Sequence, residues 1–297
     1  AIPIIIQNLL TNLVSMADNI MVGQLGTNQM SGVAIINQLF FVFNLLVFGG
    51  MSGAGLFSAQ YFGQKNHNGD VFRMKILIGI TIIAISLSVM IFLHEPLINM
   101  FLHEGSSSGN IQETFNYAKN YLYIMVIGIA PFVISNCYST TLKESGQTVV
   151  PMKAGVLAVV FDIVLNYIFI FGKLGFPAMG VVGAAIATVI SRFVECGYLV
   201  IYTHIHSNDY PFIKHCYRTL KVPGSLVKKI IVTGAPLMLN EFLWAGGLTL
   251  QTQALSTKGL ATVGGLNVCN TIGNISNCIF VTMGTTIAIV VGQLLGA

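Results

Sequence analysis

The sequence has very little charge. Only 8% of its 297 residues are Asp, Glu, Lys or Arg, whereas about a quarter of the residues in a typical soluble domain are charged. Apolar residues make up 54% of the chain, and its mean hydropathy is +0.78. Intrinsic disorder and nucleic-acid binding are excluded, because the first needs low hydrophobicity and the second needs basic patches. A chain this apolar is expected to lie in a membrane.

Paired cysteines and catalytic motifs are also missing. The five cysteines form no Cys-x-x-Cys pair and no Cys/His spacing typical of zinc sites, so they are interpreted as buried apolar thiols. A disulfide-stapled secreted fold is therefore excluded. No HExxH motif occurs, because neither His94 with Glu95 nor His103 with Glu104 is followed by a second histidine three residues after the glutamate. We expect neither a cofactor nor an enzymatic activity, and an intramembrane enzyme is the alternative from another class.

The sequence does contain a series of long apolar stretches. A membrane-spanning helix needs about 20 predominantly apolar residues. Eight such stretches are separated by polar residues: 2–22, 30–62, 71–93, 115–142, 151–171, 180–202, 226–255 and 260–295. We expect an all-α membrane protein, a polytopic helical bundle with one helix per stretch. The second and eighth stretches are longer than a bilayer is thick, so they should tilt or project beyond it.

Positive charges are distributed unevenly over the loops. Ten lysines and arginines lie near loops that follow even-numbered stretches: Lys65, Arg73, Lys75, Lys143, Lys153, Lys214, Arg218, Lys221, Lys228 and Lys229. The loops after odd-numbered stretches carry only Lys173 and Lys258. Because cytoplasmic loops retain positive charge, this asymmetry predicts a multi-pass protein of the cell (inner) membrane with a cytoplasmic N-terminus.

An internal repeat relates the two ends of the chain. An ungapped match at an offset of 233 residues extends from Pro3 to Gln64. Its identities fall mainly on Pro, Gly and Asn: Pro3 with Pro236, Leu10 with Leu243, Gly26 with Gly259, Gly32 with Gly265, Asn37 with Asn270, Asn44 with Asn277, Gln60 with Gln293, and Gly63 with Gly296. Both copies are predicted to begin on the cytoplasmic side, and such parallel repeats are typical of secondary transporters.

The repeat also predicts a division into domains. Residues 1–205 are expected to form an N-terminal lobe of six helices, residues 206–225 a cytoplasmic linker between lobes, and residues 226–297 the first two helices of a second lobe. On this reasoning we expect the natural protein to have about twelve helices, of which the last four are not in this chain. The length of the parent gene tests that expectation.

Acidic residues within the apolar stretches are the first functional candidates, because each costs about 2.5 to 3.5 kcal/mol at the centre of a membrane helix. A polar stripe at helical spacing consists of Asn8, Thr11, Ser15 and Asp18. Asp162 and Asn166 form a second polar face, and their stretch has no basic residue that could pair with the acid there. Such acids suit a proton or Na⁺, a hard cation that prefers oxygen ligands. The alternative is hydrogen bonding between helices.

Three further charged residues lie within the stretches. Arg192 and Glu195 are three residues apart and are expected to neutralise each other partly on one helix. Glu241 follows Pro236 early in the seventh stretch, where a proline frees backbone carbonyl groups. A carboxylate there could meet a cationic substrate, or it could be solvated near the cytoplasmic interface.

Several segments together resemble the multidrug and toxic compound extrusion (MATE) family. They are IPIIIQNLLTNLVSMADNIMVGQLG, GMSGAGLFSAQYFGQKN, LKESGQTVVPM, FDIVLNYIFIFG and MGVVGAAIATVISR, and they extend over nearly the whole chain. The resemblance implies twelve helices in two six-helix lobes. It also implies an exporter that exchanges Na⁺ or H⁺ for drugs, which are often cationic and aromatic.

The resemblance assigns roles to individual residues. Asp18 matches the first-helix acid of the family's cation site, and Thr188 resembles a hydroxyl that completes it. Some members carry Asn and then Asp four residues later in the fifth helix, whereas this chain has Asp162 and then Asn166. Asp18 and Asp162 are the predicted ligands if the ion is Na⁺. Glu241 resembles the seventh-helix acid of the second lobe.

The expected function is antiport by alternating access, in which two lobes rock about a central cavity. Asn37 and Glu241 are the predicted substrate-binding residues. The expected partners are a drug-like small molecule and the lipid bilayer, with no nucleic acid and a monomeric state. A lipid or glycan-precursor flippase of the wider superfamily is the closest alternative, and it would need a more basic cavity than these acids provide.

Overall fold

The computed structural model describes residues 2–64, 69–99, 111–213, 222–256 and 260–297, and every regular element in those ranges is a helix. The elements are α1 (Ile2–Gly23), α2 (Thr27–Gly63), α3 (Asp70–Phe92), α4 (His94–Asn99), α5 (Ile111–Ile127), α6 (Ile129–Glu144), α7 (Val149–Phe171), α8 (Val181–Ile205), the 3₁₀ turn η1 (Pro211–Ile213), α9 (Gly224–Ser256) and α10 (Leu260–Gly296). Each of the eight apolar stretches corresponds to one helix or to the α5–α6 pair. The predicted all-α bundle is therefore confirmed.

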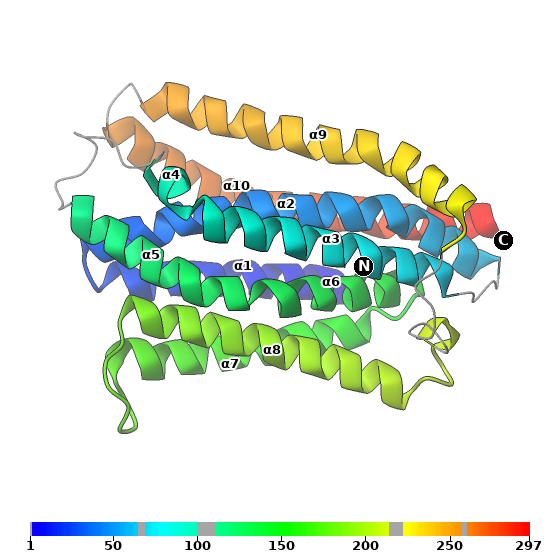
Figure 1. Cartoon of the computed structure of the whole chain (residues 1–297), viewed down its shortest axis with the longest axis horizontal. Helices are drawn as coiled ribbons and strands as arrows, with labels where there is room; N and C mark the ends of the chain where they lie inside the picture. Colours follow the sequence, from blue (N-terminus) through cyan, green and yellow to red (C-terminus); the bar gives the residue numbers. More distant parts are fainter. Residues whose placement is uncertain (1, 65–68, 100–110, 214–221, 257–259) are drawn as a thin grey trace.

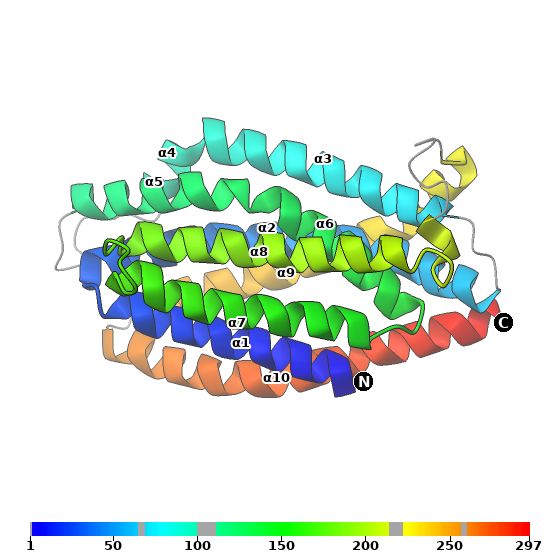
Figure 2. The ribbon, with the colours of Figure 1, turned by 90° about the horizontal axis from the view of Figure 1, so that it is seen from below.

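The long helices run roughly parallel to one another along the longest axis of the molecule (Figures 1 and 2). Helix α2 lies at the centre and packs against α1, α3, α5, α6, α9 and α10. Within the described residues, α2, α3, α7 and α8 are long and apolar enough to cross a membrane, and the α5–α6 pair counts as a fifth span if its two bent parts are taken together. Helices α2 and α10 have 37 residues each, as the lengths of the second and eighth stretches predict.

Many large apolar side chains lie on the outside of this bundle. Examples are Phe92 (81% exposed), Ile205 (73%) and Leu243 (64%). In water such a surface would be unfavourable, because each square ångström of exposed apolar area costs about 25 cal/mol. Lipid chains remove this cost, and the outer surface of the bundle fits the membrane location that the composition predicts.

The single helix predicted for residues 115–142 is broken. Helices α5 and α6 meet at Gly128 and are bent by 46°. Pro131 lies in the first turn of α6 and has no N–H group, so it cannot donate to the carbonyl four residues earlier, at Ile127. Proline is a common cause of such a bend, and here it places the carbonyl of Gly128 next to α8.

The contacts between α2 and α10 form symmetric pairs when positions are related by the 233-residue offset of the repeat. Ala59 and Gly292 are equivalent at the 233-residue offset, and a Cβ built on Gly292 would lie 2.9 Å from the Cβ of Ala59. A Cβ on Gly63 would meet the carbonyl of Gln293, and one on Gly296 would meet the carbonyl of the equivalent Gln60. Reciprocity of this kind is what a two-fold relation between two segments produces.

One loop charge proves to be wrongly interpreted. Lys75 was counted among the cations near the loop after the second stretch, but it lies within α3, where its side chain is 0% exposed and forms an ion pair with Glu144, with 2.5 Å between Nζ and Oε2. Lys75 lies on the side of α3 that packs against α6. Five other counted cations, Lys65, Lys214, Arg218, Lys221 and Lys258, lie outside the described residues.

Candidate functional site

The structure brings together four predicted residues from three helices. The amide nitrogen of Asn166 on α7 donates hydrogen bonds to Asp18 on α1, at 2.7 Å, and to Asp162 on its own helix, at 3.2 Å. Asp18 and Asp162 are also within hydrogen-bonding reach of each other. Thr188 on α8 contributes a hydroxyl to the side of Asp162. This set, Asp18, Asp162, Asn166 and Thr188, is called the acid site below.

Close packing of α7 against its neighbours positions the acid site. A Cβ on Gly183 of α8 would lie 2.7 Å from the carbonyl group of Phe169, so only glycine permits this approach of α8 to α7. On the other side of α7, Gly155 accommodates the side chain of Gln7 from α1. Asp162 and Asn166 are consequently buried, at 4% and 0% exposure.

Ser191 is a site residue that the sequence interpretation did not identify. Its hydroxyl is 3.1 Å from Oδ1 of Asp162 and 2.8 Å from the carbonyl of Thr188. Its spacing of three residues from Thr188 places both on one face of α8, which is the signal that could have found it. Two α8 hydroxyls therefore face the acid on α7.

Arg192 is the nearby positive charge that the sequence interpretation assigned to another partner. Its guanidinium lies 5.0 Å from the ring centre of Phe132 and 5.4 Å from that of Phe40, and it donates to the carbonyl of Gly128 at 3.5 Å. It attracts Asp162 as well as Glu195 electrostatically. The cation on the helix of Asp162 is Lys153, nine residues earlier, and the positive charge that attracts this acid is Arg192 of α8.

The polar stripe on α1 is engaged at its two ends. Asn8 donates to the hydroxyl of Thr282 on α10 at 2.7 Å, and Asp18 belongs to the acid site. Between them, Thr11 and Ser15 are exposed and donate to backbone carbonyls of their own helix. The stripe therefore contacts both α10 and α7 through its terminal members.

The two predicted substrate residues lie apart from the acid site. Asn37 is exposed on α2, and Glu241 is half-buried on α9, which continues as a helix through Pro236.

An apolar groove of about 310 Å³ lies between α2, α3 and α9. It is lined by residues that include Gly49, Gly53, Met74, Ile82, Gly234 and Met238.

The acid site offers several oxygen atoms to a small cation. Oδ1 of Asn166 is buried and has no hydrogen-bond partner among the described residues. A buried acceptor without a partner is costly, and a cation that accepts its lone pair removes the cost. With the two carboxylates and the α8 hydroxyls, this oxygen fits Na⁺. The two carboxyls equally suit a proton, because a hydrogen bond between them requires one of them to be protonated.

Comparisons with known proteins agree with this architecture. A family model described as MatE matches residues 3–168. The chain is 31% identical over 272 residues to the probable multidrug resistance protein NorM of Thermotoga maritima, and the match covers 89% of this chain and 55% of that protein. It is 26% identical to the probable multidrug resistance protein YoeA of Bacillus subtilis, covering 100% of this chain and 63% of the relative. The chain thus spans somewhat more than half the length of these relatives.

Solved structures share the fold. The Vibrio cholerae MATE transporter VcmN aligns with a TM-score of 0.85 at 18% identity, covering 99% of this chain and 64% of that chain. A transporter of the MOP superfamily from Pyrococcus furiosus, described as having a binding pocket of reverse polarity, aligns with a TM-score of 0.83 at 24% identity, covering 99% of this chain and 63% of that chain.

Proposed function

The chain belongs to the MatE family of membrane transporters, and from this premise we propose that it acts in a secondary antiporter. The antiporter exports cationic, aromatic drug-like compounds in exchange for Na⁺ or H⁺. The observation that carries the proposal is the acid site itself, in which the amide of Asn166 bridges the carboxyls of Asp18 and Asp162 across two helices. A monovalent cation or a proton bound there would change the charge between α1 and α7.

The names of the relatives support the cargo class. Both relatives described above are named probable multidrug resistance proteins. Members of this family are transporters and not enzymes, which supports a non-enzymatic function. The flippase alternative is not favoured, because the site is acidic and an anionic headgroup would need the opposite charge.

The reversed order of Asp162 and Asn166 is compatible with the same function. Both side chains lie on one face of α7, one turn apart. The amide of Asn166 contacts both Asp162 and Asp18. A cation that lies between α1 and α7 would meet one carboxylate and one amide oxygen in either order. The reversed order keeps the same charge and the same number of ligand groups. It moves the carboxylate along the axis of α7 by about 6 Å, the rise of four residues.

Location and assembly are part of the proposal. We infer a multi-pass protein of the cell (inner) membrane with a cytoplasmic N-terminus, because the lysines and arginines favour the loops after even-numbered helices. We also infer that it works as a monomer without a cofactor.

The membrane potential supplies enough energy for coupling. Each charge that moves through 100 mV supplies about 2.3 kcal/mol, which is enough to bias a two-state equilibrium about fiftyfold.

Efflux measurements test the function. Cells that lack their own exporters would express the full-length gene product, and ethidium or fluoroquinolone efflux would be followed while Na⁺ and pH are varied separately. We expect efflux to depend on one of the two ions and to be lost in Asp18→Asn. The variant Asn37→Ala tests whether Asn37 binds the exported compound. Normal export by Asp18→Asn at all pH and Na⁺ values would contradict the coupling role.

A further inference from the structure

The contact between the two repeats is centred near the ends of α2 and α10. Ala59 and Gly292, which are equivalent at the 233-residue offset, face each other there. The next residue on each helix is a glutamine, Gln60 on α2 and Gln293 on α10, and these two are also equivalent. Their backbone carbonyls face glycines of the opposite helix in the same symmetric way. An approximate two-fold axis therefore passes between Ala59 and Gly292.

Contacts of the neighbouring helices follow the same axis. Helix α9 repeats α1 and α10 repeats α2, so the packing of α2 against α9 should be matched by packing of α1 against α10. Both contacts are present. A Cβ on Gly53 of α2 would lie 2.6 Å from Cα of Gly234 on α9, and Asn8 of α1 donates to Thr282 of α10 at 2.7 Å. The contact between the repeats thus approximates an isologous interface, in which each contact of one helix occurs again for its equivalent.

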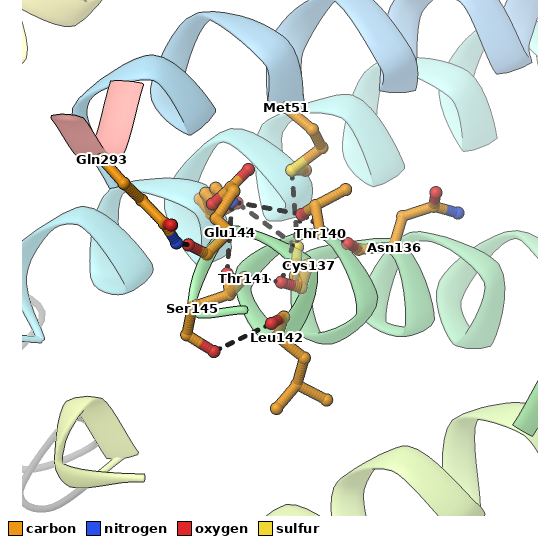
Figure 3. Close-up of polar contacts among 10 residues, drawn as sticks. Met51, Asn136, Cys137, Thr140, Thr141, Leu142, Glu144, Ser145 and Gln293 are labelled. Carbon is orange, nitrogen blue, oxygen red and sulfur yellow. Dashed lines mark hydrogen bonds and ion pairs between the residues drawn. The ribbon is translucent and has the colours of Figure 1, made fainter. Parts of the chain in front are cut away.

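The side chain of Gln293 joins the second repeat to the first (Figure 3). Its amide donates to the backbone carbonyl of Glu144, at the end of α6, with 2.6 Å between nitrogen and oxygen. The side chain of Glu144 is held by Lys75 at 2.5 Å, and it packs so closely on Gly55 that a Cβ there would lie 2.5 Å from its carboxylate. The carbonyl that Gln293 binds is consequently fixed in place by α2 and α3.

Gln60 is the equivalent of Gln293, and its amide is uncommitted. The side chain is half-buried and forms no hydrogen bond within the part of the chain that the structure describes. An amide in such a place is costly without a partner. The two-fold axis carries Gln293 onto Gln60, and it carries the end of α6 onto the end of a second copy of α6. The symmetry therefore specifies the missing partner of Gln60.

The face of α10 that a second α6 would cover is exposed. In the first repeat, Met51 and Gly55 of α2 are buried against α6, and the thiol of Cys137 lies 3.8 Å from the sulfur of Met51. The equivalents of these two residues on α10, Gly284 and Ala288, are both exposed and both small. Small residues permit the close approach of another helix in a membrane. The relatives described above are longer than this chain, which leaves room in a full-length protein for such a helix.

We propose that the full-length protein contains a second copy of α6 that docks on this face, and that Gln60 donates to the carbonyl at its end. Gln293 and Gln60 then form a symmetric pair of hydrogen bonds between the two lobes, one in each direction. Both glutamines lie at the end of the bundle where the C-terminus lies (Figure 1). The pair fastens the lobes together at that end. The proposal concerns the assembly of the lobes, so it holds whether or not the protein exports drugs.

Cross-linking in the full-length protein, without its native cysteines, tests the predicted contact. The reference pair is Gln293→Cys with Ser145→Cys. The carbonyl that Gln293 binds belongs to the peptide bond between Glu144 and Ser145, and the substitution of Ser145 spares the buried ion pair. The test pair is Gln60→Cys with a cysteine at the position 233 residues after Ser145. A bifunctional thiol reagent is used, because a glutamine side chain separates the Cβ atoms by more than a disulfide can span.

We expect both pairs to cross-link within one molecule and with similar yields. The matched controls are Phe62→Cys and Leu295→Cys, which are equivalent, lie on the opposite face two residues further along, and are 37% and 73% exposed. In place of the glutamine positions, they should lose the cross-link. A test pair that fails while the reference pair succeeds, or that joins two molecules, would overturn the proposal. Failure of both pairs would do so too, because the symmetry starts from the contact of Gln293.

The hydrogen bonds are tested separately by Gln60→Met and Gln293→Met, which keep the length of the side chain and remove the donor. Each should change the folding equilibrium constant of the full-length protein about threefold, the average for hydrogen bonds between membrane helices. The double variant should show the product of the two changes, as independent sites do. Denaturant titration in detergent measures all three. A change for Gln293→Met with none for Gln60→Met would refute the role of Gln60.

Discussion

Lys75 and Glu144 form an ion pair whose contribution to stability depends on both partners being present. Lys75 is 0% exposed, and its ammonium group makes three hydrogen bonds, to Glu144 and to two threonine hydroxyls. Substitution of Lys75 by Met keeps the length of the side chain and leaves the carboxylate of Glu144 buried without its cation. Loss of one partner of a buried pair costs about 3 to 5 kcal/mol.

The double variant Lys75→Met with Glu144→Met gives a sharper expectation. Thr140 and Thr141 keep hydrogen bonds to backbone carbonyls of their own helix, at 2.7 and 2.8 Å, so the pair can be removed without leaving these hydroxyls unpartnered. Replacement of both charges by apolar groups is often neutral or stabilising by about 1 to 4 kcal/mol. The double variant should therefore be more stable than either single variant.

Thermal unfolding in detergent, followed by circular dichroism, measures the effect. Each kcal/mol changes Tm by about 2 °C or more in a chain of this size, so the single variants should unfold about 6 to 10 °C earlier. Lys153→Met makes the same substitution at an exposed position near the start of α7 and should leave Tm within about 1 °C. Single variants that are as stable as Lys153→Met would refute the reasoning.

Three other expectations concern the acid site and its supports. Gly183→Ala should lower stability by about 1 to 3 kcal/mol, because the added methyl group meets the backbone of Phe169. At Gly197 an added Cβ would have no neighbouring atom within 4 Å, so Gly197→Ala should be neutral or raise stability by up to about 1 kcal/mol. Denaturant titration of the two variants compares these effects. Asp162→Asn should abolish ion-coupled efflux, and adding Asn166→Asp should restore part of it, because the double variant keeps one carboxylate on the same face of α7; a double variant as inactive as the single one would contradict the shared role. Ser191→Ala removes a hydrogen bond to a carboxylate and should weaken cation binding about tenfold in a direct binding assay, and unchanged affinity would exclude Ser191 from the site.

The architecture could be predicted from the sequence almost completely. Apolar stretches of about 20 residues have few alternatives to a helix, because backbone groups in lipid must satisfy each other within the segment. Seven of the eight stretches correspond to one helix each and the fourth to the α5–α6 pair, with ends that agree within about four residues. The bend at Gly128 was missed, although Pro131 marks its place in the sequence.

The acid site was predicted only in part. Asp18, Asp162 and Asn166 were identified because a charge or amide within an apolar helix is a local signal, whereas Thr188 was identified only through the resemblance to the MATE family. Whether they meet depends on how α1, α7 and α8 pack, and the hydrogen bond between Asn166 and Asp18 joins residues that are 148 positions apart.

The sequence by itself determined that the chain is a helical membrane protein, which helices repeat, and which polar residues are too costly to be incidental. Only the tertiary structure decided the partners of those residues. Lys75 was counted among the loop cations and is buried, and Arg192 was paired with Glu195 of its own helix but also attracts the acid on α7. Spacing along one helix shows which side chains share a face, but the neighbour of that face is set by contacts between distant segments.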